Sequence, residues 1–280
     1  PWRPDFAGVM AVRGCGNALF HVGGGVGTIR EDRAGSLRGR GLGVFVAPGA
    51  LGLFLGAQIA GEGVWQVWTE GIGILMALLC IVVCRYRCCS RTARAEVPEM
   101  DKGAVPGRRR PASAEVEMPG RAAGGMKAAF CCLAVVALRS YIGMAVALPW
   151  KSGLLAGTLA VLAVVCGKVA GGFAAARHGM RKTAAVSLGL AAACYLGSAV
   201  MPLGLAAVFL FNMTMPMTLY WLVCRLPKRP GFAFGFLTFA LFLGFLPVYF
   251  GLEMGAGNML GCAGSVLSLL LLAAGMGREG

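Results

Sequence analysis

Nine stretches of about 20 apolar residues, almost free of charged side chains, follow one another along this 280-residue chain. A helix of 20 residues is about 30 Å long, which is the thickness of the hydrocarbon core of a bilayer. A water-soluble domain carries about 25% charged residues, whereas this chain is 14% charged and 58% hydrophobic. The sequence therefore excludes an ordinary water-soluble globule and predicts an all-α, polytopic membrane helix bundle.

About nine transmembrane helices are expected. Their predicted ranges are 6–26, 42–60, 64–83, 128–148, 154–176, 183–203, 205–223, 232–250 and 254–275. The closest neighbours are separated at Gly204, because one helix of about 40 residues would span roughly 60 Å, twice the hydrocarbon thickness.

Basic residues indicate which side of the membrane each loop occupies, because they stay on the cytoplasmic side. Taking alternate loops, 21 of the 26 Lys and Arg residues fall on one side, and only Arg3 and Lys151 fall on the other. The remaining three, Arg13, Arg139 and Lys168, lie within apolar stretches. This asymmetry predicts a plasma (inner) membrane protein with its N-terminus outside and its C-terminus in the cytoplasm. The net charge of +14 then reflects topology, so the expected partner is the lipid bilayer and not nucleic acid.

The longest interruption, residues 85–127, contains three consecutive arginines and five acidic residues. Its composition is typical of a solvated linker. We therefore expect three parts: a partial N-terminal bundle of three helices over residues 1–84, a cytoplasmic linker over 85–127, and a C-terminal bundle of six helices over 128–280. Transporters built from three-helix repeats have helix counts in units of three.

The loop after the fifth stretch carries a recognisable spacing of glycines and basic residues. Gly172, Arg177, Gly179, Arg181 and Lys182 are placed as in the cytoplasmic loop signature of the major facilitator superfamily, Gly-x-x-x-Asp-Arg-x-Gly-Arg-Arg-Lys. The chain resembles this superfamily but has alanine where the family has its acid and methionine at a basic position. The resemblance implies major-facilitator-type three-helix repeats and an N-terminally truncated transporter that holds helices four to twelve.

A second motif lies in the stretch 42–60. Gly43, Pro48, Gly52 and Gly56 are similar to the glycine–proline motif in the fifth helix of proton-coupled antiporters. Small residues permit close helix crossing, and proline weakens the helix at a bend; a packed, kinked helix is the alternative interpretation. The segments 16–21 and 138–141 resemble the fosmidomycin-resistance-type branch of the superfamily, which implies efflux.

Polar residues inside a membrane are costly unless they face protein or water, and therefore indicate a transport path. Arg13, Asn17 and His21 are spaced four residues apart and share one helix face. The other members of the predicted path are Arg139, Tyr141, Asn212, Thr214 and Tyr220. Under the resemblance, the three helices that carry these residues line the central cavity.

The sequence leaves the roles of Arg139 and His21 open between two or more interpretations. Arg139 has no carboxylate partner within the apolar stretches, so it receives an anionic or zwitterionic substrate, caps backbone carbonyls, or pairs with an acid from helices outside the chain. His21 is the side chain in the path whose ordinary pKa suits proton coupling, or it is a hydrogen-bonded structural residue. Lys168 either braces the loop motif or faces the cavity.

Other function classes find little support in the sequence. Gly167-Lys168 is not followed by Ser or Thr, so no phosphate loop is present, and Cys84, Cys88 and Cys89 lack the spacing of a zinc site. We expect no cofactor, no metal and no enzymatic activity. The predicted function is secondary active transport of a small anionic or zwitterionic solute or drug by alternating access, with proton coupling as a hypothesis. A non-transporting membrane partner or scaffold protein, and then a membrane-embedded enzyme, are the alternatives.

Overall fold

The structure is a computed structural model that describes residues 4–34, 39–60, 71–82, 85, 122–226, 229–252 and 257–276. The chain divides into two compact units, Pro1–Phe54 with Gly120–Gly280 and Leu55–Pro119. The second unit contains the last residues of the helix Pro48–Ala60 and the short helix Gly71–Val82. Except for Gly56, which lies in the second unit, the residues discussed below as a candidate site belong to the first unit.

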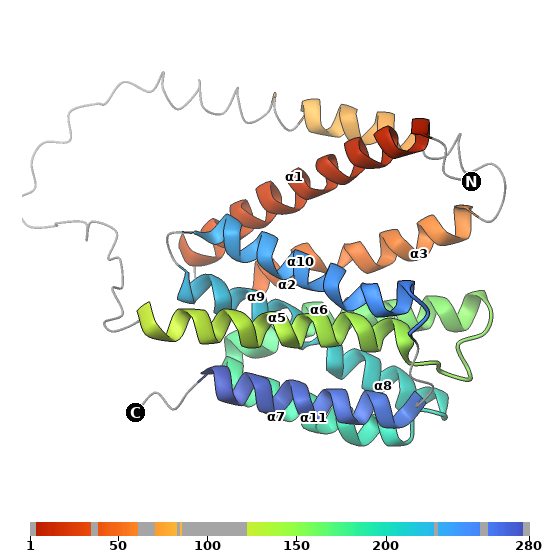
Figure 1. Ribbon diagram of the computed structural model, residues 1–280, viewed down its shortest axis with the longest axis vertical. Helices are drawn as coiled ribbons and strands as arrows, with labels where there is room; N and C mark the ends of the chain where they lie inside the picture. Colours follow the sequence, from red (N-terminus) through yellow and green to blue (C-terminus); the bar gives the residue numbers. More distant parts are fainter. Residues whose placement is uncertain are drawn as a thin grey trace, which may run out of the picture. The chain divides into compact units, whose positions relative to one another are not determined.

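The described part of the chain is helical and contains no strand (Figure 1). The labelled helices are α1 (Pro4–Ala34), α2 (Arg40–Val46), α3 (Pro48–Ala60), α5 (Ala122–Ala145), α6 (Leu154–His178), α7 (Met180–Leu196), α8 (Met201–Asn212), α9 (Thr214–Arg225), α10 (Pro230–Tyr249) and α11 (Gly257–Met276).

Six of the described stretches are long and apolar enough to cross a membrane. They are Arg40–Gln58, Met126–Ala145, Leu154–His178, Met201–Arg225, Pro230–Tyr249 and Gly257–Met276. The all-helical class is therefore confirmed, and these six helices indicate an integral membrane protein. The expected count of nine is not confirmed: α7 has only 17 residues, the helix Gly71–Val82 is shorter still, and α1 is not among the six.

Two predicted boundaries are wrong. The first helix continues to Ala34 through residues expected to form a loop. The predicted break at Gly204 instead lies within α8, and the connection between α7 and α8 is formed by residues 197–200. A Cβ at Gly204 would overlap the ring of Trp150, so this glycine serves close packing. Most of the predicted linker, including the cysteine cluster at 84, 88 and 89, lies outside the described residues.

At several glycines, helices of the first unit approach each other so closely that their backbones are in contact. A Cβ built on Gly167 would overlap the carbonyl oxygen of Phe209, and one on Gly171 would overlap that of Met213. Gly244 makes the same kind of approach to Ala137, which joins α10 to α5. Without a hydrophobic driving force between helices in lipid, such close packing is a principal source of association.

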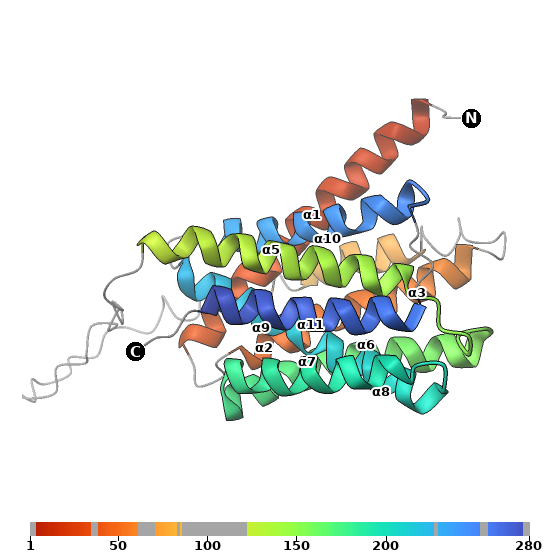
Figure 2. The ribbon, with the colours of Figure 1, turned by 60° about the horizontal axis from the view of Figure 1, so that its bottom comes forward.

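The contacts of the first unit define two ends of its helices (Figures 1 and 2). At one end, which we call the basic end, Arg181 at the start of α7 donates a hydrogen bond to the carbonyl oxygen of Met276 at the end of α11. At the other end, the Trp150 indole donates to the carbonyl oxygen of Ser198 at 2.9 Å, and the Ser198 hydroxyl donates to Asn258 at 2.9 Å. The α6–α7 connection therefore lies at the basic end, and the α5–α6 and α7–α8 connections lie at the opposite end.

Candidate functional site

Arg139 on α5 is the central residue of the candidate site. Its side chain is 7% exposed and donates a hydrogen bond from Nη1 to Oδ1 of Asn212 at 3.4 Å. Nη2 contacts the sulfur of Met215, a weak acceptor, and the buried Nε has no partner among the described residues. The guanidinium charge is thus held by one amide and one thioether, so much of its positive charge is uncompensated.

The residues that hold Arg139 lie on both sides of a break in a long helix. The helix α8 ends at Asn212, Met213 forms a turn, and α9 begins at Thr214. Pro216 is the physical cause, because proline has no N–H for the carbonyl four residues earlier, that of Asn212, and its ring clashes with it. The Thr214 hydroxyl also donates to the carbonyl oxygen of Phe211 at 2.8 Å, a bond that bends helices. The break lies halfway along the span Met201–Arg225.

Lys168 on α6 makes a comparable contact at a second break. Its ammonium donates to the carbonyl oxygen of Val46 at 3.3 Å, where α2 ends and α3 restarts at Pro48. Lys168 is 9% exposed and satisfies a carbonyl that the interrupted helix leaves free; its roles in bracing the loop motif or facing the cavity stay predictions.

The other residues of the predicted path have separate surroundings. The Tyr141 hydroxyl donates to the carbonyl oxygen of Leu252 at 3.3 Å. Thr214 is buried, and the ring of Tyr220 lies 3.1 Å from a Cβ built on Gly39. A hydrogen bond joins Arg139 to Asn212 within the predicted path. The side chains of Arg13 and Asn17 lie outside the described residues.

His21 belongs to a cluster of aromatic rings. Its ring centroid lies 5.8 Å from that of Phe20, 6.5 Å from that of Phe45 and 6.4 Å from that of Phe234. The cluster joins α1, α2 and α10, and His21 itself is partly exposed.

The loop motif forms a tight connection at the basic end. Gly179 alone separates α6 from α7 and has φ of +88°, a conformation that favours glycine. Arg177 and Lys182 are exposed, and Arg181 binds Met276 as described above. Gly172 is buried within α6, where it meets α2.

The Gly43 motif divides into a packed part and an exposed part. Gly43 is buried, and a Cβ there would lie 2.9 Å from the carbonyl oxygen of Lys168. Pro48 begins α3 immediately after the break at Ala47. At Gly52 and Gly56, no described atom lies within 4 Å of an added Cβ. The close crossing therefore uses the beginning of the motif.

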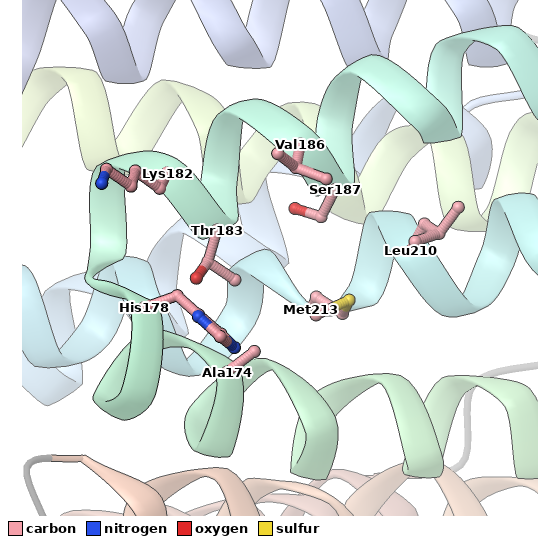
Figure 3. A pocket seen from close by; sticks show the side chains of 8 residues that line it. All are labelled: Ala174, His178, Lys182, Thr183, Val186, Ser187, Leu210 and Met213. Carbon is pink, nitrogen blue, oxygen red and sulfur yellow. The ribbon is translucent and has the colours of Figure 1, made fainter.

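A cavity of about 330 Å³ lies near the loop motif, between α6, α7 and α8 (Figure 3). Its wall is formed by Ala174, His178, Lys182, Thr183, Val186, Ser187, Leu210 and Met213. Arg139 does not line it. Leu210 and Met213 form part of the cavity wall, whereas Asn212 and Met215 of the same span contact Arg139.

One structural residue was missed in the sequence. Asp32 is 2% exposed and accepts hydrogen bonds at 3.0 Å from the backbone N–H groups of Gly41 and Leu42, at the start of α2. It therefore caps α2 from the end of α1. The run of charges around it was interpreted as a loop, and no local capping signal marks Asp32, because it lies within α1, nine and ten residues before the N–H groups that it accepts from.

Comparison with models of known protein families, with curated proteins and with solved structures finds no match for this chain. The likeness to the major facilitator superfamily therefore depends on the motifs in the chain itself. The described residues contain no cluster of three or more His, Cys, Asp or Glu side chains that could hold a metal ion.

Proposed function

We propose that this chain acts in the secondary active transport of a small anionic or zwitterionic solute, as a transporter of the major facilitator type. The observation that carries the proposal is Arg139, a buried guanidinium whose described partners are an amide and a thioether and whose Nε is unpartnered. An arginine at the centre of a membrane helix costs about 2.5–3.5 kcal/mol on insertion scales. An anionic group of the solute would offset that cost.

The broken helix beside Arg139 supports a solute site at this depth. Backbone that departs from a helix within the membrane is tolerated where it is buried in protein or lines a cavity. In many secondary transporters, interrupted helices near the midplane form the solute site. The break at Met213 lies halfway along its span, and Asn212 and Met215 on either side of it contact Arg139.

The distribution of charge between the two ends supports the orientation. Among the described loops, Arg177, Arg181 and Lys182 lie at the basic end, and Lys151 lies beside Trp150 at the opposite end. Basic residues are retained on the cytoplasmic side. We therefore place the basic end, including the end of α11, in the cytoplasm of a cell bounded by a plasma (inner) membrane.

His21 is the group to which we assign proton coupling. It lies in the aromatic cluster that joins α1 and α2 to α10, so a change in its charge would act where helices from both sides of the predicted linker meet. In alternating access these two sets of helices rock against each other around the solute site.

Uptake into vesicles tests the proposal. The purified chain is reconstituted into phosphatidylethanolamine–phosphatidylglycerol vesicles, and radiolabelled phosphate, lactate, alanine and choline are offered separately. We expect accumulation of an anion or a zwitterion but not of choline, and a loss of about tenfold or more in Arg139→Gln. Lys151→Gln, which removes an exposed charge at the opposite end, serves as the matched control.

Two outcomes would contradict the proposal. Equal uptake by the wild type and by Arg139→Gln would remove Arg139 from the site. A folded, inserted wild type that accumulates none of the four probes would favour the non-transporting membrane partner.

A further inference from the structure

The cavity between α6, α7 and α8 has a wall that is almost entirely apolar, although several of its residues are polar. The reason lies in the hydroxyl groups. Thr183 donates its hydroxyl to the carbonyl oxygen of Gly179 at 2.9 Å, and Ser187 donates to that of Ala184 at 3.3 Å. Both hydroxyls form hydrogen bonds within their own helix. The cavity therefore presents mainly hydrocarbon surface, and few hydrogen-bonding groups, to a chain-like ligand.

The two basic residues of the cavity wall, Lys182 and His178, lie at one end of it. In Figure 3, His178 and Lys182 lie beside the turn between α6 and α7, whereas Val186, Leu210 and Met213 extend along α7 and α8. Lys182 lies in the first turn of α7, where the helix dipole also favours an anion. None of the residues that form the wall is acidic.

This polarity matches the layers of a membrane. His178 ends α6 and Lys182 lies in the first turn of α7, whereas Met213 lies halfway along the span Met201–Arg225. In a bilayer crossed by these spans, headgroups would lie at the helix ends and acyl chains beside Met213. The volume of about 330 Å³ is at the lower end of the roughly 300–1,000 Å³ of ligand pockets. It suits part of one acyl chain, with the headgroup left at the mouth.

We infer that this cavity binds an anionic phospholipid, with the phosphate at His178 and Lys182 and one acyl chain against Val186, Leu210 and Met213. Basic pockets between transmembrane helices on the cytoplasmic side bind anionic headgroups. The inference depends on the membrane character of the helices and on the cavity. It does not depend on solute transport at Arg139.

Native mass spectrometry of the full-length chain in detergent tests this site. Dioleoyl-phosphatidylglycerol is titrated against dioleoyl-phosphatidylcholine, and sn-glycerol 3-phosphate provides the phosphate without acyl chains. We expect one phosphatidylglycerol to be retained with an affinity at least fivefold above that of phosphatidylcholine, because one basic residue near an anionic lipid contributes about that factor. Lys182→Gln should remove most of this preference.

Val186→Trp is the second variant, because it fills the apolar part of the cavity from a side chain that is 61% exposed. It should lower phosphatidylglycerol retention at least fivefold. Leu190→Trp, one turn further along α7 at a side chain that is 52% exposed and outside the wall, should leave it unchanged, as should Lys151→Gln. Equal retention of the two lipids, unchanged retention in Val186→Trp, or equally tight binding of sn-glycerol 3-phosphate would each overturn the inference.

Discussion

Gly43 and Gly172 form the crossing point of α2 and α6: a Cβ built on either residue would lie 3.3 Å from the Cα of the other. One glycine comes from the Gly-Pro motif and the other from the loop motif. The two motifs were recognised separately in the sequence, and the structure joins them in one helix crossing. Lys168 lies at the same crossing, since its carbonyl oxygen is the nearest atom to a Cβ on Gly43.

Gly43→Leu should destabilise this crossing. A larger side chain would have to displace the backbone of α6, and overpacking of this kind costs about 1–3 kcal/mol. The measurement is the thermal unfolding of the purified chain in detergent. Gly52→Leu is the matched control, because no described atom lies within 4 Å of a Cβ there; equal destabilisation by both substitutions would contradict the crossing.

Asp32→Ala should lower stability by about 1–2 kcal/mol, the usual effect of removing a helix cap. The substitution leaves the N–H groups of Gly41 and Leu42 without their acceptor. Asp32→Asn should have a smaller effect, because an amide retains one acceptor oxygen. Glu31→Ala, at the exposed neighbouring residue, should be nearly neutral, and a loss equal to that of Asp32→Ala would show that general charge is responsible.

Gly179→Ala should destabilise the connection between α6 and α7 by about 1–3 kcal/mol, because an L-residue is strained at φ of +88°. Gly189→Ala lies on the exposed side of α7 with no described atom near its added Cβ. That control should be stabilising by up to about 1 kcal/mol. If the two substitutions shifted the unfolding temperature in the same direction, the tight turn would not be the cause.

Asn212→Ala should weaken solute binding while leaving the maximal rate of uptake nearly unchanged. The amide positions Arg139 through one hydrogen bond, so its loss leaves the guanidinium in place but less ordered. A net hydrogen bond to a charged group contributes about 1.5–3 kcal/mol, which corresponds to a rise of about tenfold or more in the half-saturating concentration. A change confined to the maximal rate would assign Asn212 to a conformational step.

His21→Gln should flatten the dependence of uptake on pH between about pH 5 and 8, where histidine ordinarily titrates. Phe20→Leu disturbs the same aromatic cluster without removing a titratable group, so its profile should keep the wild-type shape. A wild-type profile in His21→Gln would show that proton coupling resides elsewhere.

Fusions to the C-terminus test the predicted orientation. A fluorescent protein that folds only in the cytoplasm should fluoresce there, and an alkaline phosphatase that folds only outside should be inactive. The opposite result in both fusions would place the basic end outside the cell and contradict the orientation inferred from the basic residues.

The helical class and the approximate helix positions were predictable, because length and hydrophobicity together determine what a membrane accepts. The break between α7 and α8 was not, because Gly204 looked like a helix end and instead packs against Trp150. A lone glycine does not distinguish these two uses; only the neighbour across the interface does. Asp32 was missed for a related reason, since a charge run describes a solvated loop and a buried cap equally well.

Within the candidate site, sequence spacing identified Arg139 and Asn212 but could not place them together. Their hydrogen bond depends on the packing of α5 against the α8–α9 helix, which is a relation between residues 73 positions apart. The effect of Pro216 on the helix ladder is clear only in the structure, where α8 ends at Asn212 and α9 begins at Thr214. Their membership of a transport path stays a prediction.

The break at Met213 gives the Met201–Arg225 span two hydrogen-bond ladders in place of one. Its first half, α8, packs on α6 and α7, and its second half, α9, packs on α5 and α10 as well. The two halves therefore have different sets of neighbours. Arg139 holds Asn212 with one nitrogen and Met215 with another, one on each side of the joint. Any bending at Met213 changes the distance between Asn212 and Met215. The two contacts of the guanidinium therefore depend on the angle between α8 and α9.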